Sequence, residues 1–72
     1  MNYVNAKKLF SISKDSYDAI KHLKRYERAG IKFIYVRNEV RINIRYMMYI
    51  IVSKTKDGYS LSQIYDELLY YY

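Results

Sequence analysis

The sequence predicts a mainly α fold with one small β-hairpin: four helices and two strands in a single domain, residues 1–72. Apolar residues recur at helical spacing along most of the chain. The segment 31–42 is instead rich in Ile, Phe, Tyr and Val, as strands are. The only two glycines, Gly30 and Gly58, stand where the helical patterns stop. A chain of this length accommodates one domain, and the lack of cysteine excludes disulfides and thiolate metal sites.

The first predicted helix follows Asn5, which is a suitable N-cap for the segment AKKLF at positions 6–10. Its apolar residues form one face of the helix. The next three residues, Ser-Ile-Ser at 11–13, predict a tight turn with Ile12 as its buried anchor.

The second predicted helix spans residues 14–29 and is capped by Ser13. It is expected to end at Gly30 in a left-handed conformation. Apolar residues recur at helical spacing from Tyr17 to Tyr26. The side chains left for solvent or a ligand are Lys14, Asp18, Lys21, Arg25 and Arg28.

A β-hairpin is predicted at 31–42, with Asn38-Glu39 as its two-residue turn, because Asn tolerates a positive φ. Asn43 then predicts the start of a third helix, residues 44–56, which stops at Asp57-Gly58. By periodicity alone, the run YMMYIIV at 46–52 is also compatible with a buried strand. The length of the pattern favours a helix.

The last predicted helix has the clearest start signal, a capping box formed by Ser60 and Gln63. Tyr59 is placed to pack on Ile64 as a hydrophobic staple. Four tyrosines are expected on the apolar sides of the predicted helices: Tyr17, Tyr26, Tyr49 and Tyr65.

The net charge of +6 is concentrated in the first part of the chain. Residues 1–45 hold eleven Lys and Arg against four Asp and Glu, a balance of +7, whereas residues 46–72 hold two against three, a balance of −1. A basic surface on a small domain favours a polyanionic partner. The longest apolar run is far shorter than the roughly 20 residues needed to span a bilayer. The N-terminus lacks a signal peptide pattern, so we expect a cytoplasmic protein without a membrane partner.

The predicted order of elements is that of a winged helix-turn-helix: helix-turn-helix at 5–29, wing at 31–42, closing helix pair at 44–71. Such domains place a recognition helix in the major groove, while the wing contacts the backbone or the minor groove. Arg37 and Arg41 flank the hairpin turn, and we expect them on the same side of the molecule as Lys14 and Lys21. The predicted DNA contacts are Lys14, Ser16, Lys21, Arg25, Tyr35, Arg37, Asn38, Arg41 and Arg45.

Residues 4–69 also resemble the N-terminal DNA-binding domain of MerR-type regulators and the related excisionase-like winged helices. The matching segments are VNAKKLFSIS, VRNEVRIN and IRYMMYIIVSKTKDGYSLSQIYDELL, of which KDGYSLSQIYDEL is the most specific. The chain departs from the family at Ser11, where glycine is usual, and at Asp15, Asp18 and Ala19, where Arg and Tyr are usual.

This resemblance implies a stand-alone binder of double-stranded DNA, without an effector domain for small molecules. It would be a small transcriptional regulator or a recombination directionality factor of phage, plasmid or viral origin. Proteins of this kind act as homodimers or as cooperative arrays on DNA.

Two other functions remain open. Asp15 and Asp18 on the reading helix are compatible with a protein-interaction module, such as a viral inhibitor of a host protein. The hairpin tyrosines, Tyr35 above all, are compatible with RNA binding. The C-terminal tyrosines 70–72 and the leftover face of 46–52 predict a dimer contact.

An enzyme is not expected, because no nucleophile, general base or metal-binding constellation is present, and neither a metal nor another cofactor is implied. His22 stands without other ligand residues at suitable spacing and is expected at the surface.

Overall fold

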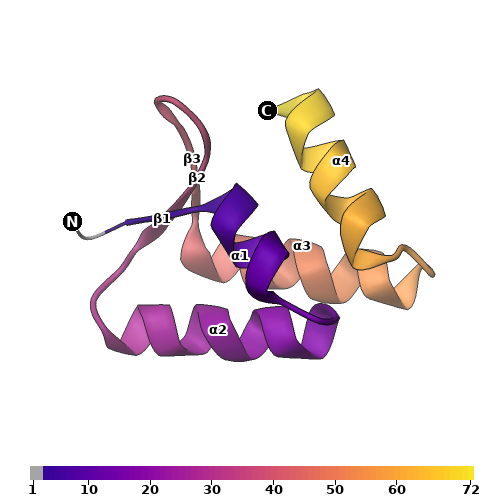
Figure 1. Ribbon diagram of the computed structural model, residues 1–72, viewed down its shortest axis with the longest axis horizontal. Coiled ribbons are helices and arrows are strands. Elements are labelled where there is room, and N and C mark those ends of the chain that lie inside the picture. Colours follow the sequence, from indigo (N-terminus) through magenta and orange to yellow (C-terminus); the bar gives the residue numbers. More distant parts are fainter. Residues whose placement is uncertain (1–2) are drawn as a thin grey trace.

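The computed structural model describes residues 3–72, which form four helices and a three-stranded sheet (Figure 1). The mainly α composition is as predicted. The elements are, in chain order, β1 (Val4–Asn5), α1 (Ala6–Ile12), α2 (Ser16–Arg28), β2 (Phe33–Arg37), β3 (Val40–Asn43), α3 (Ile44–Lys56) and α4 (Leu61–Tyr71).

The sheet has strand order β1-β2-β3, so the prediction of two strands was incomplete. β2 and β3 form the expected antiparallel hairpin, and β1 adds a parallel edge, with Val4 opposite Ile34. A strand of two residues is too short to show an alternating pattern, so only its pairing with β2 defines it.

The Asn38-Glu39 turn is confirmed, but the positive φ falls on Glu39, at 69°. The first strand of the hairpin starts two residues later than predicted. The reason lies in the end of α2, where the N–H of Ile31 donates to the carbonyl of Tyr26 at 3.0 Å. This bond holds Ile31 at the helix terminus and away from the sheet.

The turn between the first two helices was predicted two residues too early, at 11–13, whereas the structure has it at 13–15. Ser11 and Ile12 belong to α1, and Ser13 is its C-cap, with a hydroxyl that donates to the carbonyl of Leu9. Ile12 is 42% exposed, so its predicted role as a buried anchor was wrong. Asp15, in place of Ser13, is the N-cap of α2 and accepts from the N–H of Asp18 at 2.8 Å. Asp and Ser are about equally good N-caps, so the local sequence does not decide which of two neighbouring candidates starts the helix.

The second half of the chain follows the predicted elements closely. Residues 44–56 form a helix, and the side chain of Asn43 caps it by accepting from the N–H of Arg45 at 2.9 Å. Ser60 and Gln63 form the capping box of α4. The ring of Tyr59, expected to staple onto Ile64, lies 4.8 Å from the ammonium of Lys54.

Both glycines end a helix in the left-handed conformation, with φ of 92° at Gly30 and 91° at Gly58. After α3, the N–H of Tyr59 donates to the carbonyl of Lys54 and the N–H of Gly58 to that of Thr55, both at 3.0 Å. These two bonds satisfy carbonyls that the helix end would otherwise leave open.

Replacing Gly58 with alanine is expected to lower the free energy of unfolding by about 1 kcal/mol, because an L-residue is strained at this φ. No atom lies within 4 Å of an added Cβ, so the cost comes from the backbone and not from a clash. Gly58→Asn should cost less, since Asn tolerates this conformation. Urea denaturation of the two variants measures the difference, and equal losses would contradict the backbone explanation.

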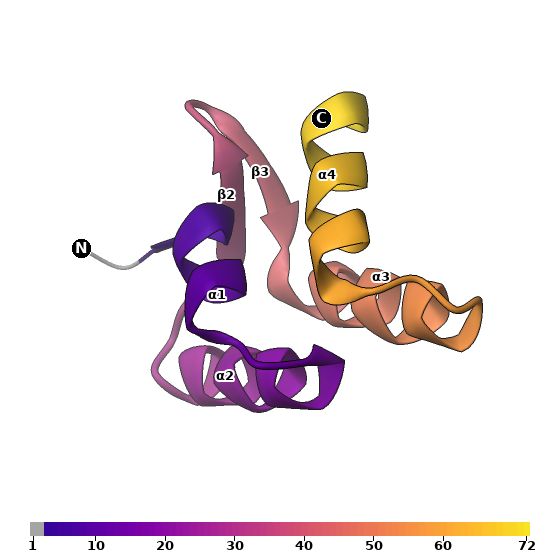
Figure 2. The same ribbon diagram turned by 45° about the vertical axis from the view of Figure 1, so that its right-hand side comes forward.

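The core lies between the inner face of the sheet and the helices (Figures 1 and 2). α2 packs on α1 and α3, while the sheet packs on α1, α3 and α4. Within residues 3–72, no helix is long and apolar enough to span a membrane. The largest fully buried side chains are those of Leu9, Leu23, Ile34, Met47, Ile51 and Ile64.

Two of the four tyrosines expected on apolar sides are exposed instead: Tyr17 at 76% and Tyr49 at 64%. Tyr26 and Tyr65 are half-buried, as expected. Ala19 and Leu23 are the buried residues of α2. At about 100° per residue, Tyr17 lies about 160° around the helix from Ala19 and about 120° from Leu23, which keeps its ring out of the core.

Candidate nucleic-acid interface

The solvent side of α2 carries a continuous row of cations. Lys21, Lys24, Arg25 and Arg28 are all exposed, and their spacing of three and four residues places them on one side of the helix. This side lies opposite the buried residues Ala19 and Leu23. The four cations are called the basic face below. Tyr17 is also exposed, one turn closer to the start of the helix, and Lys14 lies two residues before the helix begins.

None of these four cations has an ion-pair partner among the residues that the structure describes. The three ion pairs found there involve other side chains, namely His22, Arg45 and Lys54. The positive charge of the basic face is therefore available to a ligand. Of its members, Lys21 and Arg25 were predicted contacts, whereas Lys24 and Arg28 were not. Extending the three- and four-residue spacing from Lys21 would have found both.

The two aspartates at the start of α2 are engaged within the helix terminus. Asp15 is the N-cap, and Oδ2 of Asp18 accepts from the N–H of Lys14 at 3.1 Å. That backbone bond is the main cause that lowers the pKa of Asp18, helped by His22, whose Nε2 lies 3.5 Å away. Both carboxylates thus have local roles in starting the helix, which is the usual reason for acidic residues at this position.

Ser16 lies in the contact between α2 and α3. Its hydroxyl accepts a hydrogen bond of 2.6 Å from the hydroxyl of Thr55. The structure therefore places this predicted DNA contact against another helix and not on the basic face. Nothing in the local sequence marks the partner, which is 39 residues away.

Arg45, another predicted contact, forms an ion pair at the start of α3. Its Nε donates to Oε2 of Glu27 at 2.7 Å, and this bond raises the pKa of Arg45. The side chain is still 80% exposed. It lines a shallow pocket together with Lys32, next to the C-terminal end of α2.

The outer face of the sheet carries aromatic rings and an arginine. Tyr3 and Tyr35 lie with ring centroids 4.6 Å apart, and the guanidinium of Arg41 lies 4.4 Å from the ring centroid of Phe33. Arg41 is directly opposite Tyr35 in the hairpin. These four residues are called the outer sheet face below. Next to it, a pocket of about 360 Å³ is lined by Tyr3, Asn5, Tyr35, Arg37, Asn38 and Glu39.

The hairpin turn and α2 lie at opposite ends of the molecule in both views (Figures 1 and 2). The chain leaves the C-terminal end of α2 through residues 29–32, and β2 then runs away from the helix. Arg37 ends β2 beside the turn. The expectation that the arginine-bearing turn and the helix share one side was therefore wrong. They form two separate basic regions, because the direction of the hairpin is set by its packing on α1, α3 and α4.

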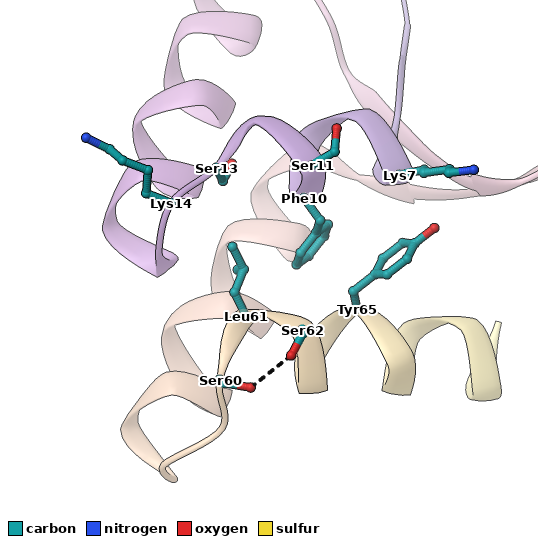
Figure 3. A pocket seen from close by; sticks show the side chains of 9 residues that line it. All are labelled: Lys7, Phe10, Ser11, Ser13, Lys14, Ser60, Leu61, Ser62 and Tyr65. Carbon is teal, nitrogen blue, oxygen red and sulfur yellow. Dashed lines mark hydrogen bonds between the residues drawn. The ribbon is translucent and has the colours of Figure 1, made fainter.

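A pocket with a volume of about 500 Å³ lies between α1 and the start of α4. Figure 3 shows its serines, with Lys7 and Lys14 extending outward at its two ends. The hydroxyl of Ser60 already accepts from the N–H of Gln63 and lies 3.3 Å from that of Ser62. The hydroxyls of Ser11 and Ser13 donate to backbone carbonyls of α1, so the serines are engaged locally and we assign the pocket no ligand.

Over residues 3–72, no group of three or more His, Asp or Glu side chains gathers at distances suited to a metal ion. The basic face of α2 and the outer sheet face are thus the two candidate binding surfaces that the geometry singles out. When the chain is compared with known proteins, no family model, no curated protein and no solved structure matches it.

Proposed function

We propose that the chain binds double-stranded DNA as a helix-turn-helix module, with α2 as the helix that enters the major groove. The observation that carries this proposal is the basic face, four exposed cations on one side of a helix, without ion-pair partners in the described part of the chain. α2 has 13 residues. Its length of about 20 Å is sufficient to cross the groove and reach phosphates on both sides.

The contact is centred on the C-terminal two-thirds of α2, from Lys21 to Arg28. Asp15 and Asp18 occupy the first turn, where negative charge repels phosphates. The cations begin one turn later, so the acids do not lie between them and the DNA. Lys32, beside the end of α2, extends the positive surface toward the adjacent backbone, whereas the charge of Arg45 is paired with that of Glu27. Arg37, which ends β2 beside the turn, has no part in this groove contact, because the hairpin turn lies at the other end of the molecule (Figures 1 and 2).

In biological terms, we propose a small regulator of transcription or a recombination directionality factor. The support is the resemblance of residues 4–69 to MerR-type and excisionase-like domains. The protein-interaction alternative was motivated by Asp15 and Asp18. Both side chains are hydrogen-bonded to backbone groups at the start of α2, which accounts for their presence without a protein partner.

A second candidate function is binding of single-stranded nucleic acid on the outer sheet face. The Tyr3–Tyr35 contact and the arginine over Phe33 favour it, because unpaired bases stack on aromatic rings while arginines hold the backbone. Tyr3 is exposed and Tyr35 half-buried, so part of each ring is accessible.

One experiment separates the two candidates: fluorescence anisotropy with a labelled duplex of about 20 base pairs and a matching single strand, at about 50 and about 200 mM salt. Four phosphate contacts predict that the duplex affinity falls about 100-fold between these salt concentrations. Tighter binding of the duplex, with this salt dependence, supports the groove contact. Tighter binding of the single strand would favour the outer sheet face. An affinity that does not change between the two salt concentrations would contradict both candidates.

A further inference from the structure

Five exposed tyrosines form a connected surface on α3 and α4. The rings of Tyr46 and Tyr49 stack with centroids 5.9 Å apart, and those of Tyr70 and Tyr71 meet edge to face at 4.9 Å. Tyr46, Tyr71 and Tyr72 line one groove between the two helices, which joins the pairs. This surface of five tyrosines is called the tyrosine face below. Their exposed fractions range from 38% to 81%.

The groove at the centre of the tyrosine face is apolar and has a volume of about 390 Å³. Its apolar lining comes from Ile50, Ile64 and Leu68. The charged groups in it, Lys54 and Glu67, are bonded to each other at 2.6 Å. A partner that covers the groove therefore leaves neither of these two charges without its counterion.

Charge favours a second copy of the chain as that partner. Two molecules of net charge +6 repel each other wherever their basic surfaces meet. The segment 46–72 has a balance of −1, with two Lys and Arg against three Asp and Glu. It contains the whole tyrosine face and is the part of the chain on which two copies can meet without strong repulsion.

The basic face of α2 stays free in such a contact, because α3 separates it from the tyrosine face. Thr55 of α3 is bonded to Ser16 of α2, and a shallow apolar pocket between these helices includes Val52. The groove with α4 is lined from α3 by other residues, Tyr46, Ile50 and Lys54. The α3 residues that contact α2 and the α3 residues that line the groove therefore lie on two different sides of this helix.

The exposed area also fits a dimer. With about 200 Å² per tyrosine, the five exposed fractions amount to about 600 Å² on each copy. A standard interface buries about 800 Å² per partner, and the groove residues supply part of the remainder. We propose that the tyrosine face is the contact surface of a symmetric homodimer. Tyr70, the most exposed of the five at 81%, is the ring that enters the groove of the second copy.

Sedimentation equilibrium in the absence of nucleic acid tests this dimer. The apparent mass should rise from 8.8 kDa toward twice that value as the concentration increases from about 1 to about 500 µM. Tyr70→Ser should weaken the association at least about tenfold, by loss of the anchoring ring. Tyr70→Lys should weaken it further, because each copy adds a positive charge to the contact.

Tyr17→Ser and Tyr17→Lys are the matched controls, since Tyr17 is a similarly exposed tyrosine, at 76%, on α2. They should leave the dimerisation constant within about twofold. Circular dichroism of all variants verifies that the helices are retained. A wild-type chain that stays at monomer mass throughout overturns the proposal and leaves the tyrosine face to a different partner. So does an equal effect of the Tyr17 and Tyr70 substitutions.

This proposal does not rest on the DNA contact, and the measurement keeps the two apart. A chain that dimerises but fails to bind DNA would contradict the proposed function alone. A monomeric chain that binds DNA would contradict the dimer alone. If both hold, each dimer carries two α2 helices, as expected for binding to a two-fold symmetric site.

Discussion

Replacing Lys21 and Arg25 together with glutamine is expected to weaken binding to duplex DNA about 100-fold at low salt. Both cations lie on the basic face, and neither has an ion-pair partner in the part of the chain that the structure describes. The estimate takes about 1.4 kcal/mol for each lost contact, within the usual range for such side chains. The slope of log affinity against log salt should fall by about two, one unit per lost phosphate contact.

The matched control is the double variant Lys7→Gln and Lys8→Gln, which loses the same net charge from two exposed side chains of α1. Anisotropy titrations of both variants on one labelled duplex give the comparison. If the contact is centred on α2, the control should bind within a few-fold of the wild-type chain. Equal losses in both variants would show that binding follows net charge alone and would contradict a groove contact through α2.

Leu23→Ala is expected to lower the free energy of unfolding by about 2 to 5 kcal/mol. Leu23 is fully buried in the centre of α2, where the helix packs on the core, and the shorter side chain leaves a cavity. The total stability of a small domain is about 5–15 kcal/mol, so we expect this variant to lose a large part of it. Urea denaturation followed by circular dichroism measures the change.

Tyr17→Ala, six residues earlier in the same helix, is the control for Leu23→Ala. Its side chain is 76% exposed, so we expect a change within about 0.5 kcal/mol. Similar losses at the two positions would mean that α2 is oriented differently and that its cations do not face solvent.

The starts and ends of the helices were the most predictable features. Asn5, Asn43 and Ser60 cap helices as expected, and Gly30 and Gly58 end them. A cap bonds to backbone groups only two or three residues away, so its signal is local. Where two caps stood close together, as Ser13 and Asp15 do, the same local reasoning chose the wrong one.

The candidate site was only partly predictable. Lys21 and Arg25 could be placed on the solvent side of α2 from spacing alone, and Lys24 and Arg28 follow from the same rule. Whether Ser16 and Arg45 are free to contact DNA could not be predicted, because their partners, Thr55 and Glu27, are distant in sequence. Contacts of this kind depend on which helices pack together, and a local pattern does not contain that information.

From its own pattern, the chain determines which segments are helical, where most helices start and stop, and where the positive charge is concentrated. These features depend on periodicity, on composition and on bonds between near neighbours. Only the tertiary structure decides that β1 joins the sheet, that Tyr17 and Tyr49 face solvent, and that the hairpin turn and α2 lie at opposite ends. The physical reason is that packing between distant segments sets the direction of each element, and many directions are compatible with the same local pattern.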